Sequence, residues 1–264
     1  MKTKFVIILF LALVVLVLNL SFAMAEDKNT AKVKKTYTER EYTAETKDGK
    51  LIHGYLSYPK TNMKGYPTVI MLHSIGRNSK DWKPLQEEFN NLGYAVLRID
   101  FRGHGKSVYD KNFRQKSWVS YSSAGFVKYP QDVTDVINKI QKETKKADFA
   151  NYVIVGSDIG ANTAVIVAKE MTVKPKGLVL IAPSMNFKGL YIPVVMTEIG
   201  KTPILAISSK TNIYFMDEQE KLSRFAQGSF DVLNTETGGA DMLLLKQQPE
   251  VQKSIVNWVK QYLK

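Results

Sequence analysis

Beyond residue 58, the chain alternates short, mainly apolar runs with segments of helical periodicity. The apolar runs predict strands that are covered on both faces of a sheet, and they lie at residues 68–72, 95–99, 152–155, 177–181, 203–207 and 230–233. Apolar residues spaced three or four apart predict amphipathic helices near residues 82–92, 133–140 and 251–262. This order predicts an α/β fold in which a mostly parallel sheet carries helices on both faces.

Residues 37–58 show a different pattern, in which polar and apolar positions alternate on both sides of Asp48-Gly49. Aspartate followed by glycine suits the positive φ values of a tight hairpin turn. The segment therefore predicts an antiparallel hairpin at the N-terminal edge of the sheet.

The first 25 residues have the three parts of a secretory signal peptide: a basic start, an apolar run over residues 5–18 and the small-residue ending Ala23-Met24-Ala25. We expect cleavage after residue 25 and export to the periplasm or the exterior. Because residues 5–25 approach the roughly 20 residues that span a bilayer, an uncleaved membrane anchor is the alternative. Residues 26–36 are charged and predict a flexible spacer before a single folded domain over residues 37–264.

Composition limits the chemistry and the partners of this domain. Without the two lysines of the leader, the formal net charge of +12 becomes +10, which predicts weak association with an anionic envelope surface. The chain has no cysteine, so disulfides and thiolate chemistry are excluded. No motif predicts a cofactor, a bound metal or a nucleic-acid partner.

The most informative motif spans residues 153–162, a buried strand that turns through Gly156 and Gly160 into a helix. This is the pattern of a nucleophile elbow, a strained turn that holds a nucleophile between small residues. The central position holds Asp158, and Ser157 lies one residue too early. The motif therefore aims a carboxylate at the catalytic position where a serine hydroxyl would be expected.

Three motifs together resemble the α/β-hydrolase superfamily, particularly its small, lidless dienelactone-hydrolase-like and esterase-like members, over roughly residues 37–264. They are His73-Ser74-Ile75-Gly76 after the third strand, Asp100-Phe101-Arg102-Gly103-His104-Gly105-Lys106-Ser107 after the next strand, and the elbow. The resemblance implies an α/β-hydrolase fold with oxyanion donors from the backbone of Ile159 and of Ser74 or Ile75. Residues 183–202, where many members insert a lid, are too few for a large cap domain.

The resemblance also implies a catalytic triad, whose other two positions are altered as well. The family's acid follows the strand at residues 203–207, where the best alignment places Asn212. The family's histidine follows the last strand, where the chain has Gly238 within Thr237-Gly238-Gly239-Ala240-Asp241. No histidine follows His104.

Superfamily members that resemble haloalkane dehalogenases and epoxide hydrolases attack with an aspartate at the elbow, but they need a histidine to activate water against the resulting ester. His53 lies in the edge hairpin, and we expect it to be a structural or surface residue. We expect His73 and His104 to stabilise their loops by hydrogen bonding, and either one is also a candidate replacement base. Asp158 is alternatively a helix cap without a catalytic task. No ligand spacing supports a metal site of His73, Asp158 and Asp241.

Three functional hypotheses follow. In the first, an exported hydrolase-family protein with a degenerate triad, a pseudoenzyme, binds a ligand or partner with little or no turnover. In the second, an active carboxylic-ester or lactone hydrolase uses Asp158 with His73 or His104. In the third, an envelope structural protein uses the basic surface alone. The simultaneous change at all three triad positions favours the first.

One connection is expected to shape the surroundings of this site. Residues 108–126 contain Phe113, Trp118, Tyr121 and Phe126. Because the segment follows a strand whose carboxyl end lies at the elbow edge, these rings are expected to form an aromatic wall over the strand ends.

Overall fold

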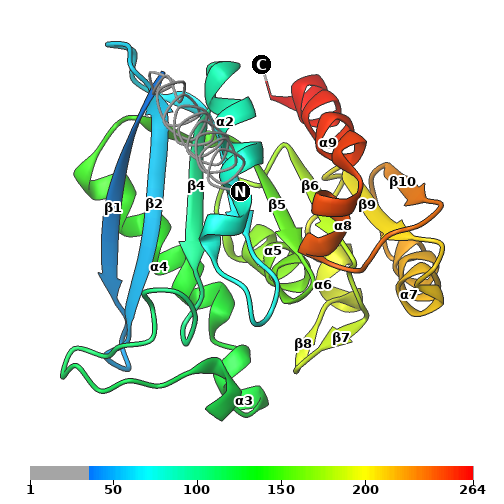
Figure 1. Cartoon of the computed structure of the whole chain (residues 1–264), viewed down its shortest axis with the longest axis horizontal. Coiled ribbons are helices and arrows are strands. Elements are labelled where there is room, and N and C mark those ends of the chain that lie inside the picture. The colour runs from blue at the N-terminus through cyan, green and yellow to red at the C-terminus, as the bar shows by residue number, and fades with distance from the viewer. Residues whose placement is uncertain (1–35, 264) are drawn as a thin grey trace, which may run out of the picture. The chain divides into compact units, whose positions relative to one another are not determined.

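The computed structural model describes residues 36–263 (Figure 1). The predicted signal peptide and nearly all of the predicted spacer lie outside the described residues. Within the described residues, no helix is long and apolar enough to cross a membrane.

A single eight-stranded sheet forms the centre of the described domain, in the order β1-β2-β4-β3-β5-β6-β9-β10. The strands are β1 (Tyr37–Glu45), β2 (Leu51–Pro59), β3 (Tyr66–Leu72), β4 (Ala95–Asp100), β5 (Ala147–Ser157), β6 (Gly177–Ile181), β9 (Ile204–Ser209) and β10 (Phe230–Thr235). Strands β1, β2 and β4 pair antiparallel, and every later pair is parallel. The predicted edge hairpin and the mostly parallel sheet are both confirmed.

Two layers of helices cover the sheet (Figure 1). The helices are α2 (Lys83–Asn91), α3 (Ser123–Phe126), α4 (Tyr129–Glu143), α5 (Ile159–Glu170), α6 (Pro193–Glu198), α7 (Ile213–Ser223), α8 (Met242–Gln247) and α9 (Pro249–Tyr262), with 3-10 turns η1 (Ser79–Trp82) and η2 (Trp118–Ser120). Because side chains alternate along a strand, Ile70 and Leu72 of β3 pack with α4 and α5, whereas Val69 and Met71 pack with α2 and α9. The central strands are therefore buried on both faces, as their apolar runs predict.

The edge strand β10 differs from its prediction. Val232, in the middle of its apolar run, is 53% exposed. An edge strand has a neighbour on one side only, so an apolar run there is only partly covered.

The connection from β6 to β9 carries the small hairpin of β7 (Asn186–Phe187) and β8 (Leu190–Tyr191), followed by α6. Asn162 of α5 holds this connection, because its amide donates to the carbonyls of Ser184 and Leu190 at 2.8 Å each. The connection contains no cap domain, as its length predicts.

The predicted aromatic wall is correct for three of its four rings. Trp118 stacks on the ring of His104, with ring centres 5.5 Å apart, and Tyr121 packs edge-on against Phe126. The prediction is wrong for Phe113, whose side chain is 83% exposed. Phe113 lies in a turn that is tied to the turn between β1 and β2 by the hydrogen bond from the Lys111 N–H to the Gly49 carbonyl at 2.9 Å, and its ring faces solvent.

The elbow glycines bring strand and helix backbones into direct contact. A Cβ on Gly160 would lie 2.3 Å from the carbonyl oxygen of Leu72, and a Cβ on Gly156 would lie 2.2 Å from the carbonyl oxygen of Gly160. No side chain fits at either position, so α5 begins directly against the carboxyl ends of β3 and β5.

We expect Gly160→Ala to lower the free energy of unfolding by roughly 2 kcal/mol or more, because the new methyl group overlaps backbone atoms that cannot move aside. Gly93→Ala is a control with positive φ but open space around the residue, and should cost about 1 kcal/mol from backbone strain alone. Urea unfolding measures both values. Equal losses would contradict the close contact at Gly160.

Candidate functional site

Asp158 lies at the tip of the turn between β5 and α5. Its backbone has φ 57° and ψ −118°, and its N–H donates to the carbonyl of Ile181 in β6 at 2.8 Å. A side-chain-bearing residue with positive φ costs on the order of 1–3 kcal/mol and persists where the surrounding structure enforces it. The chain thus builds the strained elbow around an aspartate.

Ser157 does not take the place of a nucleophile. Its side chain is fully buried, and its Oγ accepts a hydrogen bond from Ser74 Oγ at 2.9 Å. This contact ties the β3 loop to the end of β5 beneath the elbow.

The carboxylate of Asp158 is only 5% exposed, and its Oδ2 accepts a hydrogen bond from the Ile75 N–H at 3.0 Å. Burial raises the pKa of Asp158 to about 7, the N–H groups of Ile75 and Ile159 act to lower it, and the charge of Asp241 raises it further. Asp158 is the N-cap residue of α5, but its side chain does not make the usual capping hydrogen bond to the N–H groups further along the first turn. Its hydrogen-bond donor comes from the loop after β3.

The N–H group that donates to this carboxylate is a predicted oxyanion donor. The sequence predicts that either Ser74 or Ile75 supplies this donor, and the group that binds Asp158 is the N–H of Ile75. In an acyl-transfer enzyme, such donors stabilise the negative charge that develops on the substrate oxygen. Here the N–H of Ile75 is already bound to the oxygen of the elbow side chain.

His73 is fully buried, and both of its ring nitrogens contact backbone groups. Nδ1 lies 2.8 Å from the carbonyl oxygen of Ser74, and Nε2 lies 3.1 Å from the backbone nitrogen of Phe101. A carbonyl only accepts and a backbone N–H only donates, so the ring is neutral with its proton on Nδ1. Burial also lowers the pKa of His73, which favours this neutral form.

His104 repeats this arrangement one loop away. Nε2 accepts from the Gly76 N–H at 3.0 Å, and Nδ1 lies 3.2 Å from the carbonyl oxygen of Arg102. Burial, together with the neighbouring His73, lowers the pKa of His104 to about 3. The two rings join the loop after β3 to the loop after β4.

The third histidine lies outside the site. His53 belongs to β2, where Nδ1 contacts a carboxylate oxygen of Glu41 at 2.7 Å and the hydroxyl of Thr43 at 3.2 Å. These contacts are confined to the edge hairpin.

Asn212, which the alignment places at the family's acid position, is the N-cap residue of a helix. Asn212 precedes α7, and its side-chain oxygen accepts from the Phe215 N–H at 3.4 Å. The neighbouring Thr211 hydroxyl donates to the carbonyl of Gly238 at 2.9 Å, so the loops after β9 and β10 are tied together.

Gly238, which the alignment places at the family's histidine position, has a backbone conformation that favours glycine. Gly238 has φ 127°, and a Cβ there would lie 2.7 Å from Cδ1 of Leu244. The loop after β10 is therefore built around a glycine.

Two charged residues complete the surroundings of Asp158. Asp241 caps α8 by accepting from the Leu243 N–H at 2.9 Å, and burial raises its pKa. Lys188, between β7 and β8, lowers the pKa of Asp158 through its positive charge. The sequence places Asp241 near the loop that aligns with the family's histidine, but it carries no signal for Lys188, because only the folded hairpin brings this lysine towards the elbow.

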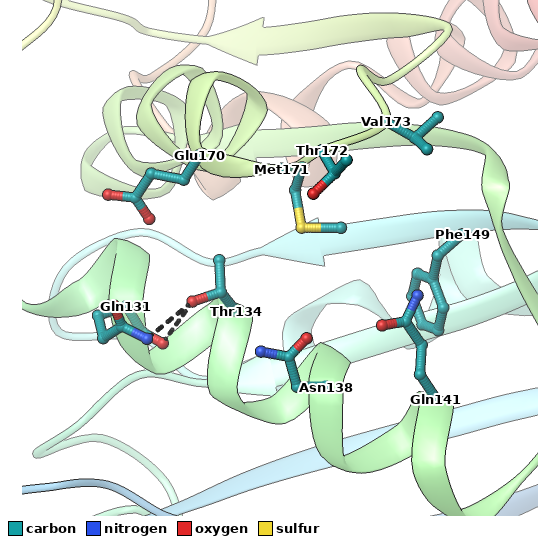
Figure 2. A pocket seen from close by; sticks show the side chains of 9 residues that line it. All are labelled: Gln131, Thr134, Asn138, Gln141, Phe149, Glu170, Met171, Thr172 and Val173. Carbon is teal, nitrogen blue, oxygen red and sulfur yellow. Dashed lines mark hydrogen bonds between the residues drawn. The ribbon is translucent and has the colours of Figure 1, made fainter.

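Within residues 36–263, no group of histidine, aspartate and glutamate side chains has the geometry to hold a metal ion. A groove of about 550 Å³ lies between α4 and α5 (Figure 2). Gln131, Thr134, Asn138 and Gln141 line it from α4, and residues 170–173 line it from the end of α5. Helix α5 begins at the elbow, so this groove lies roughly 16 Å along the helix from Asp158.

Comparison with known families agrees with this architecture. Residues 65–233 match the family described as serine aminopeptidase S33. The protein is therefore an α/β hydrolase by fold and descent. Within that superfamily, the chain belongs to the serine aminopeptidase S33 family. A search of curated proteins returned no match.

Solved structures with the same fold include esterases and dienelactone hydrolases. An acetyl xylan esterase from Paenibacillus sp. R4 has 14% identity and a TM-score of 0.71, with 88% of this chain and 86% of that chain covered. A dienelactone hydrolase from Anabaena variabilis has 14% identity, a TM-score of 0.62 and coverage of 86% and 99%. A cold-adapted esterase from an Arctic intertidal metagenomic library has 15% identity, a TM-score of 0.66 and coverage of 90% and 99%. At this identity, the similarity is one of fold.

The raised pKa of Asp158 predicts how the free energy of unfolding changes with pH. In the unfolded chain the carboxyl ionises near pH 3.8, whereas in the folded protein it ionises near pH 7. Its contribution to stability is therefore complete below pH 4 and is lost as the pH rises through 7. Asp158→Asn keeps an acceptor for the Ile75 N–H but cannot ionise. Relative to wild type it should gain roughly 2 to 4 kcal/mol between pH 4 and pH 8.

Urea unfolding of both proteins at several pH values measures this gain. Asp217→Asn, which removes an exposed carboxylate on α7, is the control and should show no comparable pH-dependent gain. A constant difference between Asp158→Asn and wild type across this range would contradict a buried, late-ionising Asp158.

We expect Gly238→Ala to lower the free energy of unfolding by roughly 2 kcal/mol, mainly from backbone strain at φ 127°, with a smaller part from displacing the end of the Leu244 side chain. Gly65→Ala, at φ 69° with nothing within 4 Å, reports the strain alone and should lose less. Thermal unfolding compares the two variants. Wild-type stability of Gly238→Ala would contradict the strain expected at this position.

Proposed function

We propose that this protein is an exported member of the esterase and dienelactone-hydrolase lineage whose triad is degenerate, and whose elbow site binds a ligand or partner with little or no turnover. The observation that carries the proposal is the hydrogen bond from the Ile75 N–H to Asp158 Oδ2. An ester substrate needs this donor for its developing oxyanion, so the elbow side chain competes with the substrate for the donor.

The lack of a general base supports the same proposal. Hydrolysis of an ester intermediate needs a base that can take a proton from water. His73 and His104 have both ring nitrogens engaged with backbone groups, and the pKa of each is lowered by burial. No histidine follows His104 in the chain.

The electrostatics of the site suggest what kind of ligand it accepts. Near neutral pH, a carboxyl with a pKa of about 7 exists in both protonation states, so Asp158 can donate or accept a hydrogen bond. Asp241 adds negative charge and Lys188 adds positive charge in its neighbourhood. We infer that the ligand is a small polar molecule that exchanges hydrogen bonds with the Asp158 carboxyl and the Ile75 N–H.

One observation favours the alternative, an active carboxylic-ester or lactone hydrolase. A carboxyl whose pKa is about 7 is well matched to general acid–base catalysis at neutral pH. This alternative requires His73 or His104 to release a backbone contact and turn towards Asp158 when substrate binds.

Turnover separates the two proposals. We expect residues 26–264 to hydrolyse p-nitrophenyl acetate and δ-valerolactone no faster than Asp158→Ala does, because neither protein has a base that activates water. Initial rates measured spectrophotometrically and by pH-stat give the comparison. Turnover that is abolished in Asp158→Ala and retained in Asn138→Leu, a control in the groove between α4 and α5, would establish an active enzyme instead.

A further inference from the structure

Phe113 combines two unfavourable features. Its side chain is 83% exposed, and its backbone has φ 58°, in the left-handed region that bulky residues avoid. No packing interaction within the described domain offsets these costs, because the ring points into solvent. The residue is therefore better explained by something that contacts it from outside.

The turn around Phe113 is held by a specific set of hydrogen bonds. Asp110 is only 4% exposed, and its Oδ1 accepts from the N–H groups of Asn112 at 2.9 Å and Arg114 at 3.0 Å. The Phe113 N–H donates to the Asp110 carbonyl at 2.9 Å, and Tyr109 pairs with Gln115 across the base of the turn. We call residues 109–116 the Phe113 turn. Its conformation is enforced, so the ring is presented at a fixed place.

The charges of the Phe113 turn are mostly positive. Lys111, Arg114 and Lys116 are exposed, and the single acid, Asp110, is buried. Lys111 pairs with Glu45 in an exposed contact, which is weak and exchanges readily for other anions. Arg114 pairs with the buried Asp110, but the arginine side chain is itself 76% exposed. The turn thus surrounds an apolar tip with cations.

Further apolar side chains lie in the same connection between β4 and α4. Val119 is 69% exposed and Tyr109 is 43% exposed. Figure 1 shows this connection, with α3, running out beyond the ends of the strands at the lower edge of the view. It follows the carboxyl end of β4, so it lies at the same edge of the sheet as the elbow.

We propose that the Phe113 turn docks the domain on an anionic lipid bilayer, with the Phe113 ring in the headgroup and acyl boundary and the three cations at the phosphates. Basic residues around exposed aromatic or aliphatic side chains suit this boundary, where the apolar group leaves water and the cations meet anionic headgroups. A soluble polyanion would satisfy the cations but would leave Phe113 in water. The exposed ring therefore favours the bilayer over a polymer.

The test uses residues 26–264 and sedimentation with phosphatidylcholine vesicles that contain or lack phosphatidylglycerol. Phe113→Asn removes the ring, and asparagine tolerates positive φ, so the turn is kept. We expect its partition coefficient to fall on the order of tenfold, the loss anticipated when a partly buried aromatic side chain is removed. Val173→Asn is the control, because Val173 is 44% exposed beside the distant end of α5. It should bind like wild type.

The contribution of the cations to vesicle binding is tested separately. Lys111→Gln should weaken binding to the phosphatidylglycerol vesicles by about fivefold and leave any binding to pure phosphatidylcholine unchanged. Circular dichroism and thermal unfolding establish that each variant is folded. Wild-type affinity in folded Phe113→Asn, or binding of wild type to soluble polyphosphate but not to vesicles, would overturn the proposal.

Discussion

The close approach of α5 to the carboxyl ends of β3 and β5 is the constraint on which the rest of the site depends. Gly156 and Gly160 allow it, because any side chain there would overlap backbone atoms. The approach forces the residue between them into a strained conformation with φ 57°. It also brings that residue beside the loop after β3, so the backbone N–H of Ile75 reaches its carboxylate. The elbow geometry of a hydrolase is thus retained for a side chain that is not serine.

A buried carboxyl in this position changes what the surrounding groups do. In a hydrolase, the oxyanion donors wait for charge to develop on the substrate. Here a donor is bound to Asp158 before any ligand arrives, and the low polarity around the carboxyl raises its pKa to about 7. His73 and His104 are similarly engaged, because Nε2 of each ring accepts from the other loop and Nδ1 contacts a carbonyl of its own loop. Asp158, His73 and His104 thus all make hydrogen bonds to backbone groups of the surrounding loops.

Much of the architecture followed from local pattern. Mainly apolar runs identified the central strands, because a strand covered on both faces buries nearly every side chain. Arg98 of β4 is buried as well, where it donates hydrogen bonds to Gln86, Ser79 and Glu39. The run at residues 230–233 was less informative, since an edge strand with the same composition leaves Val232 half exposed. The aromatic residues of 108–126 were also ambiguous. Their composition fitted a wall of rings, but Asp110 fixes a turn that directs Phe113 away from it.

The sequence by itself determined the α/β order, the antiparallel edge, the elbow with Asp158 at its centre and the absence of any histidine beyond His104. These features depend on residue identity and on spacing along the chain. Only the tertiary structure decided that Ile75 binds the Asp158 carboxylate, that both site histidines are neutral and engaged, and that Lys188 and Asp241 act on Asp158. Those features depend on which loops meet at the edge of the sheet and on how deeply each group is buried, and residues far apart in the chain settle both.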